Sequence, residues 1–176
     1  IYVYALLDDG TYLRLKTASE TSALPDYEYA LSNNRNVGYA TVSITGLNNY
    51  GGDGSIIRTN FKINPLDIGE LISKGLATIE NKTQLNNDPI QISDQQFSRQ
   101  VIVPSPRVEY GNIILRPKTG SESSFDYVLS AYYDLSGLYG NNVDVSDKLN
   151  RTKIEGVGNY TGSYIFTFRI VEKSLT

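Results

Sequence analysis

The side chains with the widest chemical range in this chain are its carboxylates. Seven aspartates in expected loops carry the oxygen ligands that Ca²⁺ prefers: Asp8, Asp9, Asp53, Asp88, Asp94, Asp144 and Asp147. They form no D-x-D-x-D-G run, so we expect turn-forming residues rather than a metal site. A glycosidase needs a carboxylate pair, but no spacing singles one out among 19 acidic residues. We therefore expect neither a metal nor a cofactor.

Histidine and cysteine are both absent from the sequence. Their absence excludes a Cys/His zinc site, a Ser/His/Asp triad and a Cys/His dyad. With most of the usual catalytic side chains missing and no carboxylate pair favoured, we expect the chain not to be an enzyme.

The charge balance restricts the partners of the chain. It has 176 residues, with 16 Lys+Arg against 19 Asp+Glu and a net charge of -3. Non-specific nucleic-acid binding needs clustered basic residues, and these are scattered, so we expect no nucleic acid. No apolar run approaches the roughly 18 residues that span a bilayer, so we expect no membrane span. There is no initiator Met and no basic segment leading into an apolar one, which predicts a processed product or an excised piece.

The elements that must position any site are strands. Asp9-Gly10 lies between two β-rich runs and predicts a hairpin over residues 2–16. Further β-rich runs bounded by Gly, Asn, Asp, Ser or Pro cover 27–31, 39–45, 56–63, 97–103, 107–116, 125–133, 151–155 and 163–171. One helix is predicted over 67–74, from the capping-box spacing of Asp67 and Glu70 and a stop at Gly75, with a strand and turn as the alternative. This pattern predicts an all-β sandwich or barrel.

An internal repeat divides the chain. Gly46, Asn49 and Tyr50 recur 110 residues later as Gly156, Asn159 and Tyr160, while Phe61 and Ile63 recur 107 later as Phe168 and Ile170. Asp26-Tyr27 recurs 100 residues on as Asp126-Tyr127. Two related units are therefore expected, over residues 1–65 and 66–176.

The repeated motif is typical of a strand, a tight turn and a returning strand. Gly46, Gly156 and Gly162 are expected to supply backbone conformations that β-branched residues resist. Tyr50 and Tyr160 are expected to pack against the end of a sandwich, and a ligand-stacking role at the loop tips is the alternative.

These motifs resemble the bacterial immunoglobulin-like repeats of bacterial surface proteins and phage virion proteins. The residues that carry the resemblance are Asp26-Tyr27, Asn33-Asn34, Val37-Gly38, Gly46, Asn49-Tyr50-Gly51 and Phe61-Lys62-Ile63, with Asp126-Tyr127, Gly156 to Gly162 and Phe168-Arg169-Ile170 in the second copy. Residues 1–23 and 64–100 match poorly. The resemblance implies two tandem immunoglobulin-like β-sandwich units, the second with insertions between Tyr133 and Lys148. Some surface domains of this kind form a Lys-Asn isopeptide crosslink, for which Lys62 and Lys153 are candidates.

Aromatic usage favours a binding surface. The chain has 14 tyrosines against five phenylalanines, and tyrosine gives rigid amphipathic contact area that suits both proteins and sugar rings. The expected contact residues are Tyr132, Tyr133, Tyr139, Asn141 and Asn142, together with Tyr50 and Tyr160 from the repeated motif. Tyrosines that merely populate half-buried strand faces are the alternative.

Two functions of different classes remain open. The first is a non-catalytic structural module on the outside of a phage particle, such as a decoration, tail or fibre component that contacts other protein subunits. The second is a stalk or tip segment of a bacterial surface adhesin that binds host protein or glycan. A carbohydrate-binding module of a secreted enzyme is a third. Residues 101–103, close to two prolines, are predicted to be an edge strand that pairs with another chain.

Overall fold

The computed structural model describes residues 1–52, 56–82, 89–133 and 136–174. The described chain consists mostly of β-strands in several small sheets, with one short α-helix, so the predicted all-β class is confirmed. None of its described helices has the length and apolar character needed to cross a membrane. Contacts divide the chain into two compact units, Ile1–Asn64 and Pro65–Thr176, which are described separately below.

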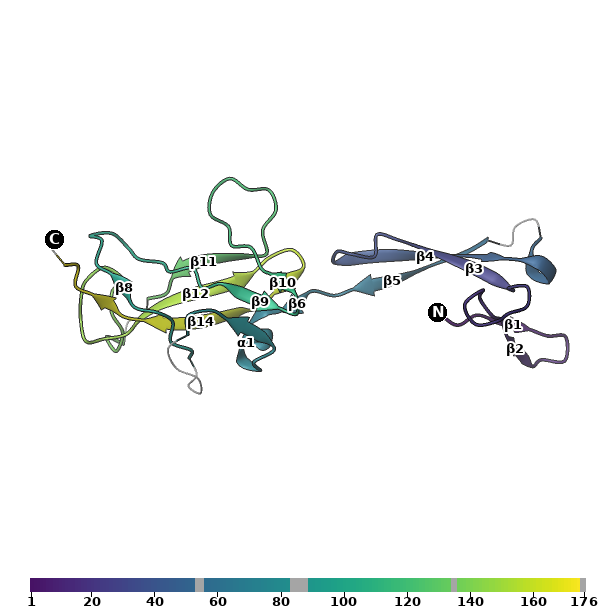
Figure 1. Cartoon of the computed structure of the whole chain (residues 1–176), viewed down its shortest axis with the longest axis horizontal. Helices are drawn as coiled ribbons and strands as arrows, with labels where there is room; N and C mark the ends of the chain where they lie inside the picture. The colour runs from purple at the N-terminus through teal and green to yellow at the C-terminus, as the bar shows by residue number, and fades with distance from the viewer. Residues whose placement is uncertain (53–55, 83–88, 134–135, 175–176) are drawn as a thin grey trace. The chain divides into compact units, whose positions relative to one another are not determined.

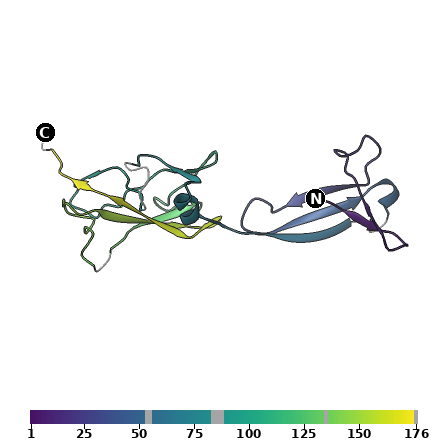
Figure 2. The ribbon, with the colours of Figure 1, turned by 90° about the horizontal axis from the view of Figure 1, so that it is seen from below.

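The first unit contains a hairpin and a three-stranded antiparallel sheet. The hairpin pairs β1 (Tyr4–Leu6) with β2 (Tyr12–Arg14) around the Asp9-Gly10 turn, as predicted. The sheet has the order β3-β4-β5, from β3 (Tyr27–Ser32), β4 (Gly38–Gly46) and β5 (Ile56–Ile63) (Figures 1 and 2). A single 3-10 turn, η1 (Asn48–Tyr50), follows β4.

The second unit repeats this sheet and adds further elements. Its main sheet has the order β11-β12-β14, from β11 (Tyr127–Ala131), β12 (Asn150–Gly156) and β14 (Ser163–Phe168). A second sheet has the order β10-β9-β7, from β7 (Ala77–Ile79), β9 (Val108–Tyr110) and β10 (Ile113–Ile114). Two short parallel pairs join β6 (Leu66–Asp67) to β13 (Tyr160–Thr161), and β8 (Gln95–Gln96) to β15 (Ile170–Val171).

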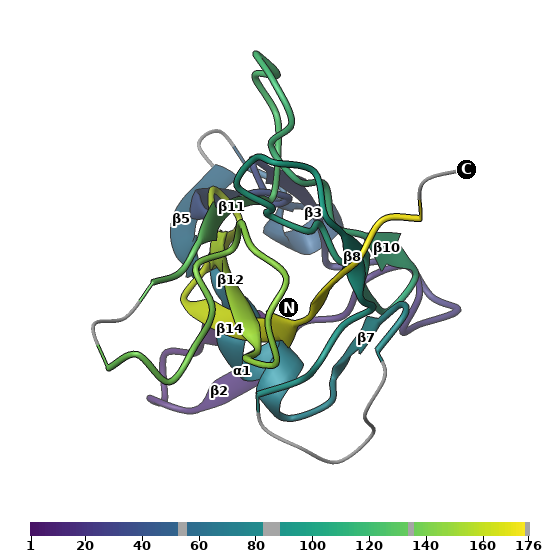
Figure 3. The same ribbon diagram turned by 90° about the vertical axis from the view of Figure 1, so that its left-hand side faces the viewer.

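The helix α1 (Ile68–Ser73) lies against the main sheet of the second unit (Figure 3). Asp67 caps it, because its Oδ1 accepts a hydrogen bond from the Glu70 amide at 3.0 Å. Gly75 follows the last turn with φ +67°, a conformation that favours glycine. The predicted helix, its cap and its stop are all confirmed. The buried face of α1, formed by Ile68, Leu71 and Ile72, points toward the sheet.

The two three-stranded sheets have the same register. Tyr27 pairs with Gly46 in the first unit, and Tyr127 pairs with Gly156 in the second. Ile44 pairs with Ile57, and at the matching place Ile154 pairs with Tyr164. The residues that recur in the sequence therefore occupy equivalent positions in the two sheets.

Hydrogen bonds around the sheets recur as well. An aspartate carboxylate, a tyrosine hydroxyl and two backbone groups make matching bonds in both units. In the first unit these are Lys16 N to Asp26 Oδ2 (2.9 Å), Tyr27 Oη to Ile1 O (2.8 Å), Leu15 N to Val3 O (2.9 Å) and Leu47 N to Asp26 O (2.8 Å). In the second they are Arg116 N to Asp126 Oδ2 (2.8 Å), Tyr127 Oη to Pro106 O (3.0 Å), Leu115 N to Val108 O (2.9 Å) and Val157 N to Asp126 O (2.9 Å).

The repeated glycines are needed for two different reasons. Gly162 has φ +71°, which agrees with the predicted conformational role. Gly46 and Gly156 have no such backbone conformation; instead, a Cβ would lie 2.0 Å from the Tyr50 carbonyl oxygen at Gly46 and 2.7 Å from the Thr161 backbone at Gly156. The reason predicted for these two glycines was therefore wrong, because close approach of the turn selects them.

Three predicted strands differ from the structure, and one of them, the 163–171 run, is divided into β14 and β15 at Arg169. Residues 97–103 form no strand, so the edge strand expected at 101–103 is wrong: the Ile102 amide donates to the Asn142 carbonyl at 2.8 Å, and Pro104 and Pro106 are buried nearby in sequence. Proline cannot donate to a ladder, which ends strand pairing there. The 107–116 run is a hairpin rather than one strand, because Gly111 at φ +62° turns the chain between β9 and β10.

The core of the second unit lies between its main sheet and the elements that precede it in the chain. Residues 65–105, here called the covering segment, contribute buried side chains to this core: Ile68, Leu71, Ile72, Ala77, Ile79 and Ile92. They pack with residues of the main sheet such as Ile154, Phe166 and Phe168, all fully buried.

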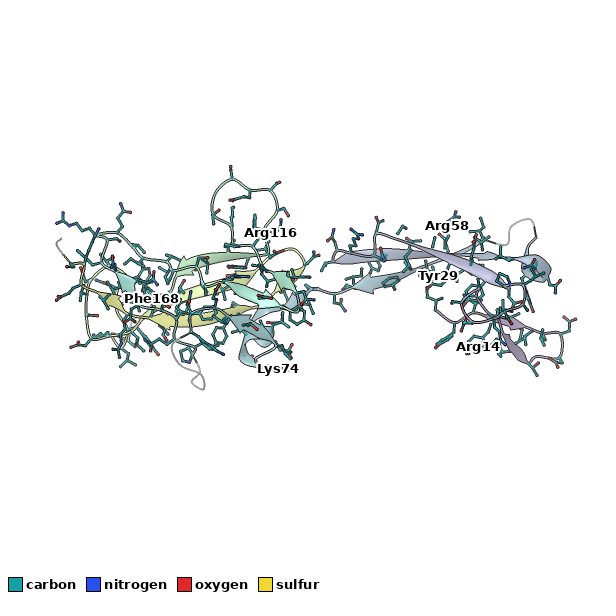
Figure 4. All side chains as sticks on the ribbon, in the orientation of Figure 1. Arg14, Tyr29, Arg58, Lys74, Arg116 and Phe168 are labelled. Carbon is teal, nitrogen blue, oxygen red and sulfur yellow. The ribbon has the colours of Figure 1, made fainter. Side chains whose placement is uncertain are left out.

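The corresponding face of the first unit is not covered in this way. Phe61 occupies the place of Phe168 but is 41% exposed, and Ile57 is 61% exposed. Tyr29 and Leu31 on the same face are also exposed. We call these residues, with the half-buried Ile44, the uncovered face. Tyr29 and Phe168 are labelled in Figure 4, as is Arg58, which lies on the opposite face of the first sheet from Tyr29.

Candidate functional site

Two of the predicted contact tyrosines lie close to one arginine in the second unit. The Arg151 guanidinium carbon lies 3.7 Å from the ring centroid of Tyr139 and 4.7 Å from that of Tyr132. Both distances allow cation–π attraction, which holds the three side chains together. We call Tyr132, Tyr139 and Arg151 the arginine–tyrosine surface.

Neighbouring strands position these side chains. Arg151 lies in β12, and its carbonyl accepts a hydrogen bond from the amide of Tyr132, just beyond β11, at 3.1 Å. Tyr139 is held by its neighbour Gly140, whose amide donates to the Leu149 carbonyl at 2.8 Å. A Cβ on Gly140 would lie 2.2 Å from Asn150 Oδ1, so only glycine allows this close approach.

Asn142 fixes the loop that carries Tyr139. Its side-chain Nδ2 donates to the backbone carbonyls of Ile102 (3.2 Å) and Arg151 (2.7 Å). Its backbone amide donates to Asn150 Oδ1 at 2.8 Å. The residue is fully buried and has φ +59°, a conformation that asparagine tolerates better than most residues. The structure thus places Asn142 beneath the surface, where it holds the loop and is not accessible to a ligand.

An open groove of about 640 Å³ extends from this surface. Its lining includes Tyr139 and Arg151, together with Ser163, Tyr164 and Ile165 of β14. Helix α1 adds polar groups, with Glu70 and Ser73 among them. A groove with aromatic rings, a guanidinium, a carboxylate and hydroxyls can hold either a polar peptide or a sugar ring.

The remaining predicted residues of the 132–142 region have different surroundings. Tyr133 is 53% exposed and Asn141 is exposed. Asn141 forms a local turn, because its Oδ1 accepts from the amides of Val143 (3.0 Å) and Asp144 (2.9 Å) and its Nδ2 donates to Asp144 Oδ2 (2.7 Å).

Tyr50 and Tyr160 do not join the arginine–tyrosine surface. Tyr160 belongs to the hydrophobic core of the second unit, and burial raises the pKa of its hydroxyl above the usual value. Tyr50 is half-buried at the end of η1 in the first unit. Tyr160 therefore packs in the core of its own unit, and Tyr50 is partly shielded in the first unit.

The candidate calcium ligands are dispersed. Among the described residues no group of three or more His, Cys, Asp or Glu side chains is placed to hold a metal ion. Asp9 accepts from the Thr11 hydroxyl (2.6 Å) and amide (2.9 Å), and these bonds hold the pKa of its carboxyl below the usual value. Asp8, Asp94, Asp144 and Asp147 are exposed. Asp53 and Asp88 lie outside the described residues.

Neither of the two candidate crosslinking lysines is buried. Lys153 Nζ lies 2.7 Å from Glu155 Oε2 in a surface ion pair, and Lys62 is exposed in β5. Surface ion pairs of this kind contribute little to stability.

Arg151 and the groove residues of α1 and β14 were missed at the level of sequence. Arg151 lies in a strand that the sequence predicts, but its neighbours follow from the pairing of β11 with β12 across the 134–149 insertion. A signal did exist in its position. The charged residues Arg151, Lys153 and Glu155 alternate with Thr152 and Ile154, which places Arg151 on the outer face of its strand.

Comparisons of the chain with protein-family models, with curated proteins and with solved structures found no match. The function must therefore be argued from the geometry above.

Proposed function

We propose that this chain is a non-catalytic structural and binding module on the outside of a phage particle, where it contacts other protein subunits. In this proposal its two units are related immunoglobulin-like sandwiches. The shared register of the two sheets and the shared sequence motif support a common unit.

The arginine–tyrosine surface is the observation that carries the binding role. Tyrosine and arginine are among the residue types enriched at the positions that contribute most to protein–protein binding. Because Arg151 contacts both rings and Asn142 fixes the loop that carries Tyr139, the surface is already ordered before a partner arrives. Ordering in advance lowers the entropy lost on binding.

A bacterial surface adhesin that binds glycan is the second candidate. The groove beside Tyr139 favours it, since a ring for stacking and the polar groups of Glu70, Ser73 and Ser163 line one concave surface. Aromatic stacking and nearby carboxylates are common features of sugar binding.

Mass spectrometry of the native source material tests the first proposal. Recovery of the chain in purified virions supports a particle component, whereas peptides from a large cell-wall protein support the adhesin. For the binding surface, Tyr139→Ala is expected to weaken attachment to the identified subunit or glycan by at least about tenfold. Tyr12→Ala, an equal change at a tyrosine 71% exposed in the other unit, is the matched control and is expected to leave attachment unchanged.

A further inference from the structure

The recurring hydrogen bonds align the two units residue by residue. The Tyr27 hydroxyl donates to the Ile1 carbonyl as the Tyr127 hydroxyl donates to the Pro106 carbonyl. Ile1 is therefore equivalent to Pro106, and the first unit is equivalent to the part of the second unit that begins there. The covering segment, residues 65–105, has no counterpart among residues 1–64.

In the second unit the covering segment has two contacts with the main sheet. Helix α1 places Ile68, Leu71 and Ile72 over the apolar face of the sheet. Further along, the segment adds a parallel strand to the outer edge of β14 and β15. The Thr167 amide donates to the Ile90 carbonyl (3.0 Å), and the Ile92 amide donates to the Thr167 carbonyl (2.9 Å).

Neither contact has an equivalent in the described part of the first unit. Ile57 and Phe61 on the uncovered face are 61% and 41% exposed, although Phe168 at the place of Phe61 is fully buried. Strand β5 is the edge of its sheet and pairs only with β4 among the described residues. Asn60 is the equivalent of Thr167, because Asn60 pairs with Thr41 in the first unit as Thr167 pairs with Arg151 in the second.

We propose that the first unit binds a polypeptide segment of the same kind as the covering segment. That segment adds a strand parallel to β5 along its open edge at Asn60, and places the apolar side of a short helix over Ile57 and Phe61. Main-chain hydrogen bonds along the edge of β5 supply affinity. The uncovered face supplies specificity, because it fits only a segment whose helix lies at the right distance from its strand. The occupant is identified by the second unit, where such a segment lies on the equivalent face and edge.

A second copy of the chain is a poorer occupant, because each chain has fewer covering segments than sheets to cover. Each chain has two sheets of this kind but only one covering segment, and that segment carries part of the core of its own unit. Lending it to a neighbour uncovers Phe166 and Phe168, so exchange between copies leaves one sheet uncovered for each sheet that it covers.

A synthetic peptide with the sequence of residues 65–105, added to the full chain, tests the proposal. The resident segment is tethered to its own sheet and has a high effective concentration there, so the free peptide is directed to the first unit. Hydrogen exchange followed by mass spectrometry is expected to show slower exchange over residues 56–63 when peptide is present, with no change over residues 163–168.

Two isoleucines of β5 provide a matched pair of variants. Ile57→Asp puts a charge on the uncovered face, and is expected to weaken peptide binding by at least about tenfold. Ile56→Asp makes the same change on the opposite face, at a side chain that is 49% exposed, and is expected to leave binding unchanged. Asn60→Pro removes the amide that faces outward at the open edge, and is expected to reduce binding without disturbing the pairing with β4.

Three results would overturn the proposal. The first is no slowing of exchange over residues 56–63 at about 100 μM peptide, which excludes even weak specific binding. The second is equal binding by the Ile56 and Ile57 variants. The third is a chain that is already dimeric without peptide and protected over 56–63, because the occupant is then a second copy. Tyr139→Ala is expected to leave peptide binding intact, so this test is independent of the arginine–tyrosine surface.

Discussion

The two units contain the same three-stranded sheet but bury it to different extents. Phe168 and Ile154 of the second unit are fully buried, whereas Phe61 at the place of Phe168 is 41% exposed and Ile44 at the place of Ile154 is half-buried. Pairing and register are nevertheless the same. The same strand pairing is therefore present with and without a covering segment, and the full burial of Phe168 and Ile154 accompanies its presence.

The largest expected effect is a difference in the stability lost when each of the two equivalent phenylalanines, Phe168 and Phe61, is replaced by alanine. Phe168→Ala removes a fully buried ring and is expected to destabilise the second unit by about 3–5 kcal/mol. Phe61→Ala removes a partly exposed ring and is expected to cost the first unit about 1 kcal/mol or less. Denaturant titration, with hydrogen exchange as the readout for each unit, measures both losses of unfolding free energy. Equal losses in the two units would contradict the difference in burial.

A second pair of variants tests what the units share. Gly46→Ala and Gly156→Ala each bring a Cβ within 3 Å of the backbone of the returning turn. Each is expected to destabilise its own unit by about 1–3 kcal/mol, because the turn must shift to make room. Gly52→Ala, where nothing lies within 4 Å of the new Cβ, is the control and should leave thermal unfolding unchanged. Tolerance at Gly46 but not at Gly156 would show that the turn is looser in the first unit.

Alkaline pH is expected to weaken the second unit through a buried hydroxyl. Burial raises the pKa of Tyr127 above its usual value of 10. Below pH 10 both states keep the proton and the full stability is present. Above it the unfolded state ionises first, so stability falls by up to about 1.4 kcal/mol per pH unit until the folded pKa is reached.

Tyr127→Phe tests this pH dependence, since it removes the ionising group and its hydrogen bond to Pro106. Urea titrations between pH 8 and 11 are expected to show a smaller alkaline loss in this variant. An unchanged slope would assign the loss to other groups.

The smallest expected effect tests how much the N-terminal cap of α1, in the covering segment, stabilises the second unit. Asp67→Ala removes the cap of α1 and is expected to destabilise the second unit by about 1 kcal/mol, with no effect on the first. Asp67→Asn keeps a capping oxygen and should recover most of the loss. Thermal unfolding monitored by hydrogen exchange distinguishes the units. Destabilisation of the first unit by Asp67→Ala would contradict their independence.

Much of the secondary structure follows from the sequence because its signals are local. The Asp9-Gly10 turn, the capped helix after Asp67 and the β5 strand were all predicted and observed. The error at residues 101–103 has a long-range cause. Three consecutive β-formers suggest a strand, but the Ile102 amide is bonded to the Asn142 carbonyl, forty residues away, and this partner leaves no local trace.

The candidate site could be predicted only in part for the same reason. Tyr132 and Tyr139 belong to one tyrosine-rich stretch that composition identifies. Their meeting at Arg151 depends on the pairing of β11 with β12, which sequence patterns leave open where an insertion separates the strands. Asn142 illustrates the opposite case, because a loop asparagine predicted to face a ligand is fully buried in a backbone network.

The position of the covering segment ahead of its sheet has a consequence for the time course of folding. In the first unit each strand pairs with its neighbour in the sequence, so its sheet closes short loops and is expected to form fast. The core of the second unit joins Ile68 and Leu71 to Phe166 and Phe168, at the far end of the unit in the sequence. On a ribosome, α1 is synthesised long before the strands against which it packs. The apolar face of α1 therefore stays exposed to solvent until β14 has been synthesised, and this interval is when the chain is most prone to aggregate.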